Sequence, residues 1–165
     1  MDDKQFLEYL NSHQIEFEHI THPAVYTVEE SDNVEIGFNG QGTKNLFLRN
    51  NNGTQYYLVV VCKEKRVDLK ELGTRMGSGR LSFGSADKME VMLGVTPGSV
   101  TIAAILNDND EQVKLFVDTE VWSAEYISCH PMVNTATIQL HSDGLRKMME
   151  KGNKIPSIIE IPVVP

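Results

Sequence analysis

The chain has 165 residues, of which 41% are hydrophobic and 23% are charged, and its formal net charge is −8. This composition is typical of a globular protein, and the length suits one domain with a sizeable core, so we expect a single domain over residues 1–165. The acidic balance argues against a general nucleic-acid coat protein and against DNA as a partner.

The sequence gives no sign of a membrane or secretory address. No apolar run approaches the roughly 20 residues that span a bilayer, and the acidic, amphipathic first ten residues are not typical of a signal peptide. Cys62 and Cys129 lie far apart and form no CxxC pair. A disulfide scaffold is therefore not expected, and a cytoplasmic location is the default.

The predicted elements begin with a helix near the N-terminus, capped by Asp2 or Asp3. Residues 15–20 alternate between apolar and polar side chains and predict a short strand. Thr27 and Glu30 have the spacing of a capping box, which predicts a second short helix.

A hairpin follows at residues 43–61, TKNLFLRNNNGTQYYLVVV. Asn-Gly between two apolar, β-branched and aromatic runs is a strong hairpin signal. Lys44 and Asn45 lie where the Gly-rich segment GFNGQG enters the first strand. A charged, hydrogen-bonding pair at this position is a candidate binding site, and a solvated strand-end lysine is the alternative.

Two capped helices and a second hairpin are predicted next. Asp68 and Ser85 each precede a helical pattern, and Gly94 ends the second of these helices. Residues 99–106 and 112–118 are predicted to be two strands joined by the polar turn NDNDE.

The last part of the chain contains one clear strand and one clear helix. Residues 119–128 are ambiguous, whereas residues 135–140 alternate as a strand. Ser142 is predicted to cap a helix that ends at Gly152, and the closing segment, with its prolines, suits only a sheet edge or an ending. The order of elements predicts one mixed α and β domain built around a sheet with several hairpins.

Positive charge is concentrated in residues 44–90, which hold nine Lys and Arg against five Asp and Glu, whereas both flanking segments are net acidic. Any contacts with phosphate are expected in this part of the chain, although charge alone favours the alternative of a solvated charged face. The candidate contacts are Lys63, Lys65, Arg66, Arg75 and Arg80.

Common catalytic motifs are missing: the sequence contains no GxxxxGK[ST], GxGxxG, HExxH or GxSxG pattern. His19 and His22 lack partners at ligand spacing, so neither a zinc site nor a cofactor is predicted. Cys129 and His130 are adjacent, and neighbouring side chains on an extended strand point to opposite faces, so they are not expected to form a nucleophilic couple. Cys129 is better explained as a small buried hydrophobe.

The stretch CHPMVNTAT places His130 and Pro131 before a strand, with Asn134 close behind. Proline fixes φ and lacks a donor, so neighbouring backbone groups can stay free to meet a ligand. The alternative is a structural turn histidine.

Several motifs in order resemble one known family. They are HPAVYTVEES, TKNLFLRNNNGTQYYLVVV, RVDLKEL, RLSFGSADKMEVMLGVTPGSVT, ILND and HPMVNTATIQL. The chain resembles the YbaK/ProX group of aminoacyl-tRNA deacylases, relatives of the editing domain in bacterial prolyl-tRNA synthetases, and it is most similar there to the freestanding ProX-type alanyl-tRNA(Pro) deacylases. The likeness extends from about residue 22 to about residue 152.

This resemblance implies an α+β (mixed α/β) fold with a central mixed, largely antiparallel sheet and surrounding helices. It implies a metal-free and cofactor-free deacylase that removes alanine from tRNA(Pro) in trans, with aminoacyl-tRNA as its substrate and prolyl-tRNA synthetase as a candidate partner. The alternatives are a deacylase for cysteine or serine, and a non-catalytic tRNA-binding or regulatory module of the same fold.

The resemblance also implies roles for single residues. Lys44 occupies the position of the family's essential lysine, and Asn45 adds directional hydrogen bonds beside it. Water, rather than a protein side chain, attacks the ester. The remaining candidates for substrate binding are Cys129, His130, Pro131 and Asn134.

The sequence departs from the family pattern at Tyr126, because many relatives have glycine four residues before the His-Pro pair. A tyrosine there is expected to narrow or reshape the pocket and leaves the amino-acid preference open. Relatives often carry proline where Ile102 stands, which is expected to affect the predicted strand more than the site.

Overall fold

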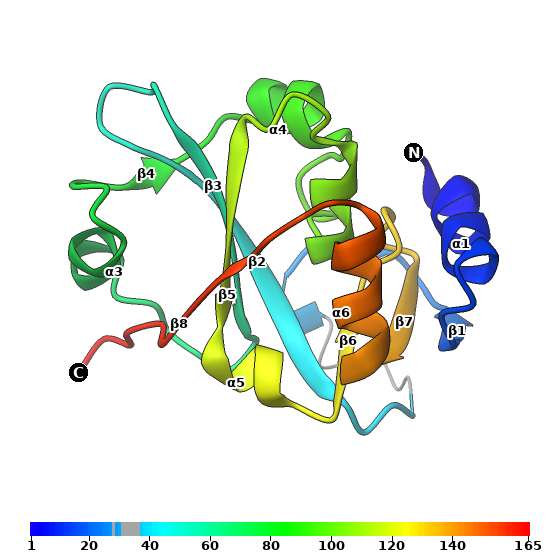
Figure 1. Ribbon diagram of the computed structural model, residues 1–165. Helices are drawn as coiled ribbons and strands as arrows, with labels where there is room; N and C mark the ends of the chain where they lie inside the picture. The colour runs from blue at the N-terminus through cyan, green and yellow to red at the C-terminus, as the bar shows by residue number, and fades with distance from the viewer. Residues whose placement is uncertain (28, 31–36) are drawn as a thin grey trace.

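The computed structural model describes the chain except for residues 28 and 31–36 (Figure 1). Its strands form one sheet in the order β1-β7-β6-β2-β3-β5-β8, with β4 paired to β2. The strands are β1 (Phe17–Thr21), β2 (Gln41–Arg49), β3 (Tyr56–Cys62), β4 (Ser82–Phe83), β5 (Val113–Asp118), β6 (Tyr126–Cys129), β7 (Ala136–His141) and β8 (Ser157–Ile159). The helices are α1 (Asp3–Ser12), α3 (Leu69–Met76), α4 (Ala86–Leu93), the 3₁₀ helix η1 (Ile102–Asn107), α5 (Thr119–Ser123) and α6 (Ser142–Lys151).

The central strand β3 is buried on both faces, as expected for its continuous apolar run. Tyr56, Leu58, Val60 and Cys62 pack into the main core cluster, which also contains residues of α1, α4, η1 and α6. The side chains that alternate with them, from Tyr57 to Val61, pack into a second cluster with Leu72 of α3. Figure 1 shows α3 at one end of the sheet, near the C-terminus, and α1 at the other.

Most predicted helix boundaries are confirmed. Asp2 caps α1, Asp68 caps α3 and Ser85 caps α4, which ends at Gly94 with φ +68°. The predicted cap of α6 is one residue late, because the His141 ring accepts the hydrogen bond from the Asp143 amide and Ser142 already belongs to the helix.

The short helix predicted around Thr27 and Glu30 is described only in part. The Glu30 amide donates to the Thr27 hydroxyl at 3.0 Å, as the capping spacing predicts. The Glu30 carboxylate accepts from the Tyr26 amide at 2.8 Å rather than from that of Thr27. The rest of this predicted helix lies outside the described residues.

The first predicted hairpin is confirmed, and the second is wrong. β2 and β3 pair antiparallel, with Lys44 opposite Val61. Residues 102–107 form η1 instead of a strand, and β5 pairs parallel to β3. Ile102 to Leu106 are all buried, and a short run that is apolar throughout does not distinguish a strand from a buried helical turn.

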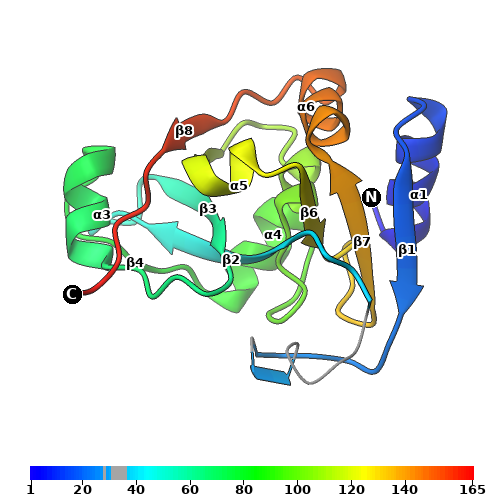
Figure 2. The same ribbon diagram turned by 90° about the horizontal axis from the view of Figure 1, so that it is seen from below.

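The predicted mixed sheet is confirmed, with four antiparallel and three parallel pairings among the described strands. The ambiguous residues 119–128 divide into α5 and the start of β6. Figure 2 shows β6 between β2 and β7, with the start of β2 beside it. This parallel pairing brings the end of β6, and so His130, close to the entrance of β2. Among the described residues, no helix has the length and apolar content that crossing a membrane requires.

Candidate active site

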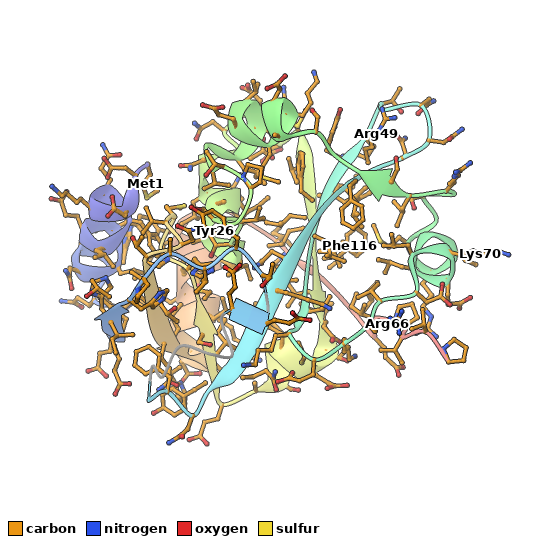
Figure 3. The ribbon with its side chains drawn as sticks, turned by 180° about the vertical axis from the view of Figure 1, so that it is seen from behind. Met1, Tyr26, Arg49, Arg66, Lys70 and Phe116 are labelled. Atoms are coloured by element: carbon orange, nitrogen blue, oxygen red, sulfur yellow. The ribbon has the colours of Figure 1, made fainter. Side chains whose placement is uncertain are left out.

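A pocket of about 240 Å³ opens where β2 separates from β6. β2 pairs with β6 only at Gln41 and Gly42 and meets β4 only at Leu48 and Arg49, so the edge between these points has no neighbouring strand among the described residues. The segment that carries Tyr26 crosses toward β2 on this side, as Figure 3 shows. The lining residues are Val25, Tyr26, Thr27, Thr43, Lys44, Asn45, Lys63, Gly98, Val100 and His130.

The open edge of β2 also presents backbone groups. On the β3 side, the Lys63 amide donates to the Gly42 carbonyl. On the opposite edge of β2, the Phe47 carbonyl accepts from the amide of Gly84, the residue that follows β4. Because an antiparallel ladder alternates, the odd-numbered residues of β2 direct their backbone groups away from β3. The backbone amide of Asn45 therefore faces the opening.

Lys44 is half-buried in the pocket wall. Burial lowers the pKa of its ammonium, and the negative charge of Glu64 partly offsets this effect. No described residue forms a hydrogen bond or ion pair with this ammonium. A partly desolvated cation without a partner favours an anionic or strongly polarised ligand, because its interaction with such a group is less screened than in water.

The two polar atoms of the Asn45 side chain differ in their hydrogen bonding. Its Nδ2 donates to the Val100 carbonyl at 3.2 Å, which connects β2 to the loop on the opposite wall. Its Oδ1 is buried and has no hydrogen-bond partner among the described residues. A buried acceptor without a partner costs free energy, so it calls for a functional explanation.

His130 contributes a neutral imidazole. Its Nδ1 lies 3.0 Å from the Ala136 carbonyl, which can only accept, so Nδ1 carries the proton. Burial lowers the pKa of His130, and the nearby His22 lowers it further, against the opposing effect of the Ala136 hydrogen bond. The imidazole is therefore mostly uncharged at pH 7, and Nε2 is left as an acceptor.

The segment above the pocket is held by Asn134. The side-chain amide of Asn134 donates to the Val25 carbonyl at 2.8 Å. The backbone carbonyl of Asn134 accepts from the Val25 amide at 3.2 Å. Asn134 itself does not line the pocket, so it positions the wall at Val25 and Tyr26 instead of binding a ligand there.

Two further residues that were predicted to bind a substrate lie outside the pocket. Cys129 and Pro131 are buried and do not line it. Burial raises the pKa of the Cys129 thiol to about 12, which agrees with the prediction of a small buried hydrophobe. Of the residues on either side of Pro131, whose backbone groups were expected to meet a ligand, His130 lines the pocket.

Tyr126 does not reshape this pocket, contrary to expectation. It starts β6 and lines a separate groove with Gln139 and His141, where its ring meets the His141 ring edge-on at 5.1 Å. Tyr126 begins β6, four residues before His130, and so lies too far along the strand to contribute to the wall of this pocket.

The basic residues predicted to contact phosphate do not lie together on the structure. Lys63 lines the pocket. The Lys65 side chain is only 12% exposed, and its ammonium lies 2.8 Å from a carboxylate oxygen of Asp118, so Lys65 is not available to contact phosphate. Arg75 pairs with Glu71 at 3.2 Å. Arg66 and Arg80 are exposed. In Figure 3, Arg66 lies with Lys70 beside α3, at the other end of the sheet from Tyr26.

Several lining residues were not identified from the sequence, namely Val25, Tyr26, Thr27, Thr43, Gly98 and Val100. Their motifs, HPAVYT and TPGSV, appear as conspicuous patterns, but nothing in them indicates that they meet in space. Among the described residues, no group of three or more His, Cys, Asp or Glu could hold a metal ion.

The chain is similar to several known proteins. A family model described as the aminoacyl-tRNA editing domain matches residues 22–148. The chain is 35% identical over 162 residues to the prolyl-tRNA editing protein ProX of Acetoanaerobium sticklandii, covering 98% of this chain and 99% of that protein. It is 32% identical over 158 residues to the prolyl-tRNA synthetase associated domain-containing protein 1 of Danio rerio, covering 94% and 85%. A crystal structure described as a candidate trans-editing enzyme for prolyl tRNA synthetase has the same fold, with a TM-score of 0.67 and 14% identity over 99% of both chains.

Proposed function

Because the chain belongs to the aminoacyl-tRNA editing domain family, we propose that it is a trans-editing deacylase that hydrolyses the ester of mischarged tRNA, with Ala-tRNA(Pro) as its preferred substrate. The observation that carries this proposal is the half-buried Lys44 ammonium, which has no partner in the described part of the chain. It lies in a small pocket whose wall also holds a neutral imidazole and an amide oxygen that is likewise without a described partner. This combination suits a polar substrate with both an anionic and an ester portion.

The size of the pocket supports alanine as the residue removed. A synthetic site shaped for proline cannot strongly exclude a smaller amino acid, because a missing methylene changes binding by only about 1–3 kcal/mol. A second and smaller pocket can reject proline by steric clash. At about 240 Å³, with the branched side chains of Val25 and Val100 among its lining residues, this pocket favours a small residue.

In the proposed mechanism, Lys44 fixes the terminal nucleotide or the ester oxygens as a positioned charge. The backbone amide of Asn45, directed to the open edge of β2, donates to the oxyanion that forms when water attacks the ester carbonyl. Donors placed before the reaction where negative charge develops are a large source of rate acceleration.

His130 is assigned to the amino-acid end of the substrate. The α-ammonium of alanine needs an acceptor, and an uncharged imidazole can supply one through Nε2 without charge repulsion. The buried Asn45 Oδ1 atom, which accepts no hydrogen bond from any residue that the structure describes, is a second acceptor in the same wall. The ribose hydroxyl beside the ester assists the attacking water, so no side-chain nucleophile is needed.

Outside the pocket, we propose that Lys63 and the exposed Arg66 and Arg80 approach the tRNA phosphates. Prolyl-tRNA synthetase supplies the mischarged substrate in this scheme, and both proteins then share the cytoplasm. The name ProX of a 35% identical relative, a prolyl-tRNA editing protein, supports the choice of tRNA(Pro).

A panel of charged tRNAs tests the proposed function. tRNA(Pro) is charged separately with alanine, cysteine, serine and proline, and loss of each ester is followed with the full-length protein. Rapid loss of alanine, with proline left intact, is the expected result. Preferential loss of cysteine or serine would reassign the substrate, and tRNA binding with no ester loss would make the protein a binding module.

Replacing Val100 by alanine is expected to relax the size selection. The Val100 side chain loses two methyl groups while its carbonyl can still accept from Asn45. Since about 1–3 kcal/mol accompanies each methylene in an apolar pocket, discrimination between Ala-tRNA(Pro) and Pro-tRNA(Pro) should fall by about tenfold or more. The ratio of the two kcat/KM values measures this effect. Unchanged rejection of proline would show that another wall sets the limit.

A further inference from the structure

Tyr26 is an exposed aromatic residue at the rim of the pocket. Its side chain is 66% exposed although the residue contributes to the pocket lining. Single exposed apolar residues are common on protein surfaces and need no explanation by themselves. In the proposed function the end of a nucleic acid enters the pocket beside this ring, so a base comes within its reach.

The backbone that leads into Tyr26 is fixed by hydrogen bonds. The Tyr26 amide donates to the Glu30 carboxylate at 2.8 Å, and both backbone groups of Val25 are bonded to Asn134. A ring carried by an anchored backbone loses little further freedom when it binds a ligand, which favours affinity.

One side of the ring lies against Gly98. A Cβ atom added to Gly98 would lie 3.0 Å from Cδ1 of Tyr26, and Gly98 has φ +89°, which side-chain-bearing residues rarely adopt. Glycine therefore lets the loop approach the ring closely. Among the described residues, no other aromatic ring contacts Tyr26 and no hydrogen bond involves its hydroxyl, so much of the ring surface is open.

The pocket is too small for a whole aminoacyl-nucleoside. Pockets that enclose drug-sized ligands have volumes of about 300–1,000 Å³, above the approximately 240 Å³ found here. When the amino acid and the ester enter, the terminal base must stay outside, at the rim where Tyr26 lies.

We propose that Tyr26 is the stacking platform for the terminal adenine of the acceptor strand. This inference rests on the proposed function and adds the group that holds the base. Stacking on an aromatic ring contributes about 1–3 kcal/mol per base, and every base has a suitable face. Together, Tyr26 at the rim of the pocket and Lys44 inside it would fix the two ends of the terminal nucleotide.

Kinetics with three variants test the role of the ring. Tyr26→Ala should lower kcat/KM for Ala-tRNA(Pro) by about 5- to 150-fold, mainly through a higher KM, which is the fold-change expected for losing one stacked base. Tyr26→Phe keeps the ring and should stay within about twofold of wild type. Tyr126→Ala, which removes an exposed tyrosine outside the pocket, is the matched control and should have no effect.

The same variants should behave differently on a substrate without the base. On an acceptor hairpin whose terminal alanylated ribose is abasic, wild type and Tyr26→Ala should show equal kcat/KM. An equal loss on both substrates would overturn the proposal, because Tyr26 would then act on the pocket itself. A loss in Tyr26→Phe as large as in Tyr26→Ala would also overturn it, since the hydroxyl would be the important group.

A binding experiment separates this inference from the proposed function. An uncharged acceptor hairpin with 2-aminopurine at its terminal position should lose fluorescence on adding wild type or Tyr26→Phe, but not Tyr26→Ala. If wild type hydrolyses Ala-tRNA(Pro) without quenching the probe, only the stacking proposal fails. If it quenches without hydrolysing, only the proposed function fails, and if it does neither, both fail.

Discussion

Lys44→Ala is expected to lower kcat/KM for Ala-tRNA(Pro) hydrolysis by about 100- to 1,000-fold, the range found when one preorganised charged or hydrogen-bonding group is removed from a transition state. The expected loss is large because the Lys44 ammonium is half-buried and unpaired among the described residues, so it is available to the substrate. Single-turnover decay of the alanyl ester measures the effect.

Lys4→Ala provides the matched control, because Lys4 is exposed on α1 and lies in an acidic part of the chain. It should keep the wild-type rate. Equal decay with wild type and Lys44→Ala would contradict the assigned role of Lys44. A thermal unfolding curve that superposes on that of wild type would exclude misfolding as the cause of a loss.

Lys65→Met is expected to lower the free energy of unfolding by about 3–5 kcal/mol, the usual cost of leaving one member of a buried ion pair without its partner. The Lys65 ammonium lies 2.8 Å from Asp118, which is fully buried, and 3.1 Å from Glu120. Burial opposes the charge of Lys65, but the two nearby carboxylates outweigh this effect and raise its pKa. Urea denaturation measures the loss.

Two comparisons isolate the charge effect. Lys65→Met combined with Asp118→Asn should be more stable than Lys65→Met alone, because no unpaired buried carboxylate is left. Arg75→Met breaks the half-exposed pair with Glu71 and should cost no more than about 1 kcal/mol. A cost for Lys65→Met as small as that of Arg75→Met would show that the buried pair adds little to stability.

The local features of the fold were predictable because they depend on neighbours in the chain. Asp2, Asp68 and Ser85 cap their helices through side chains that reach amides three residues ahead. The Asn-Gly turn joins β2 and β3 because Gly53, with φ +68°, tolerates a conformation that other residues avoid. The run before β5 was misread because periodicity carries no information where every side chain is buried.

From the sequence, residues of the candidate site were predictable only where they belong to a recognisable motif. Lys44, Asn45 and His130 were identified by resemblance to a family and line one pocket. Cys129 and Pro131 were identified by the same motif but are buried outside the pocket, since burial depends on what packs around a strand end. In the sequence, Lys65 is one of several basic residues. Only the structure shows that it forms an ion pair with Asp118, which lies 53 positions later in the chain.

By itself the sequence determined the helix caps, the first hairpin and the family to which the chain belongs, because these follow from short-range chemistry and ordered motifs. Tertiary structure decided that β6 lies parallel to the start of β2 and separates from it, which creates the pocket. It also decided that Tyr26 meets Gly98 and that Asn45 reaches Val100. Contacts of this kind join residues more than 50 positions apart, and only the packing of the whole chain fixes which of the many possible pairs form.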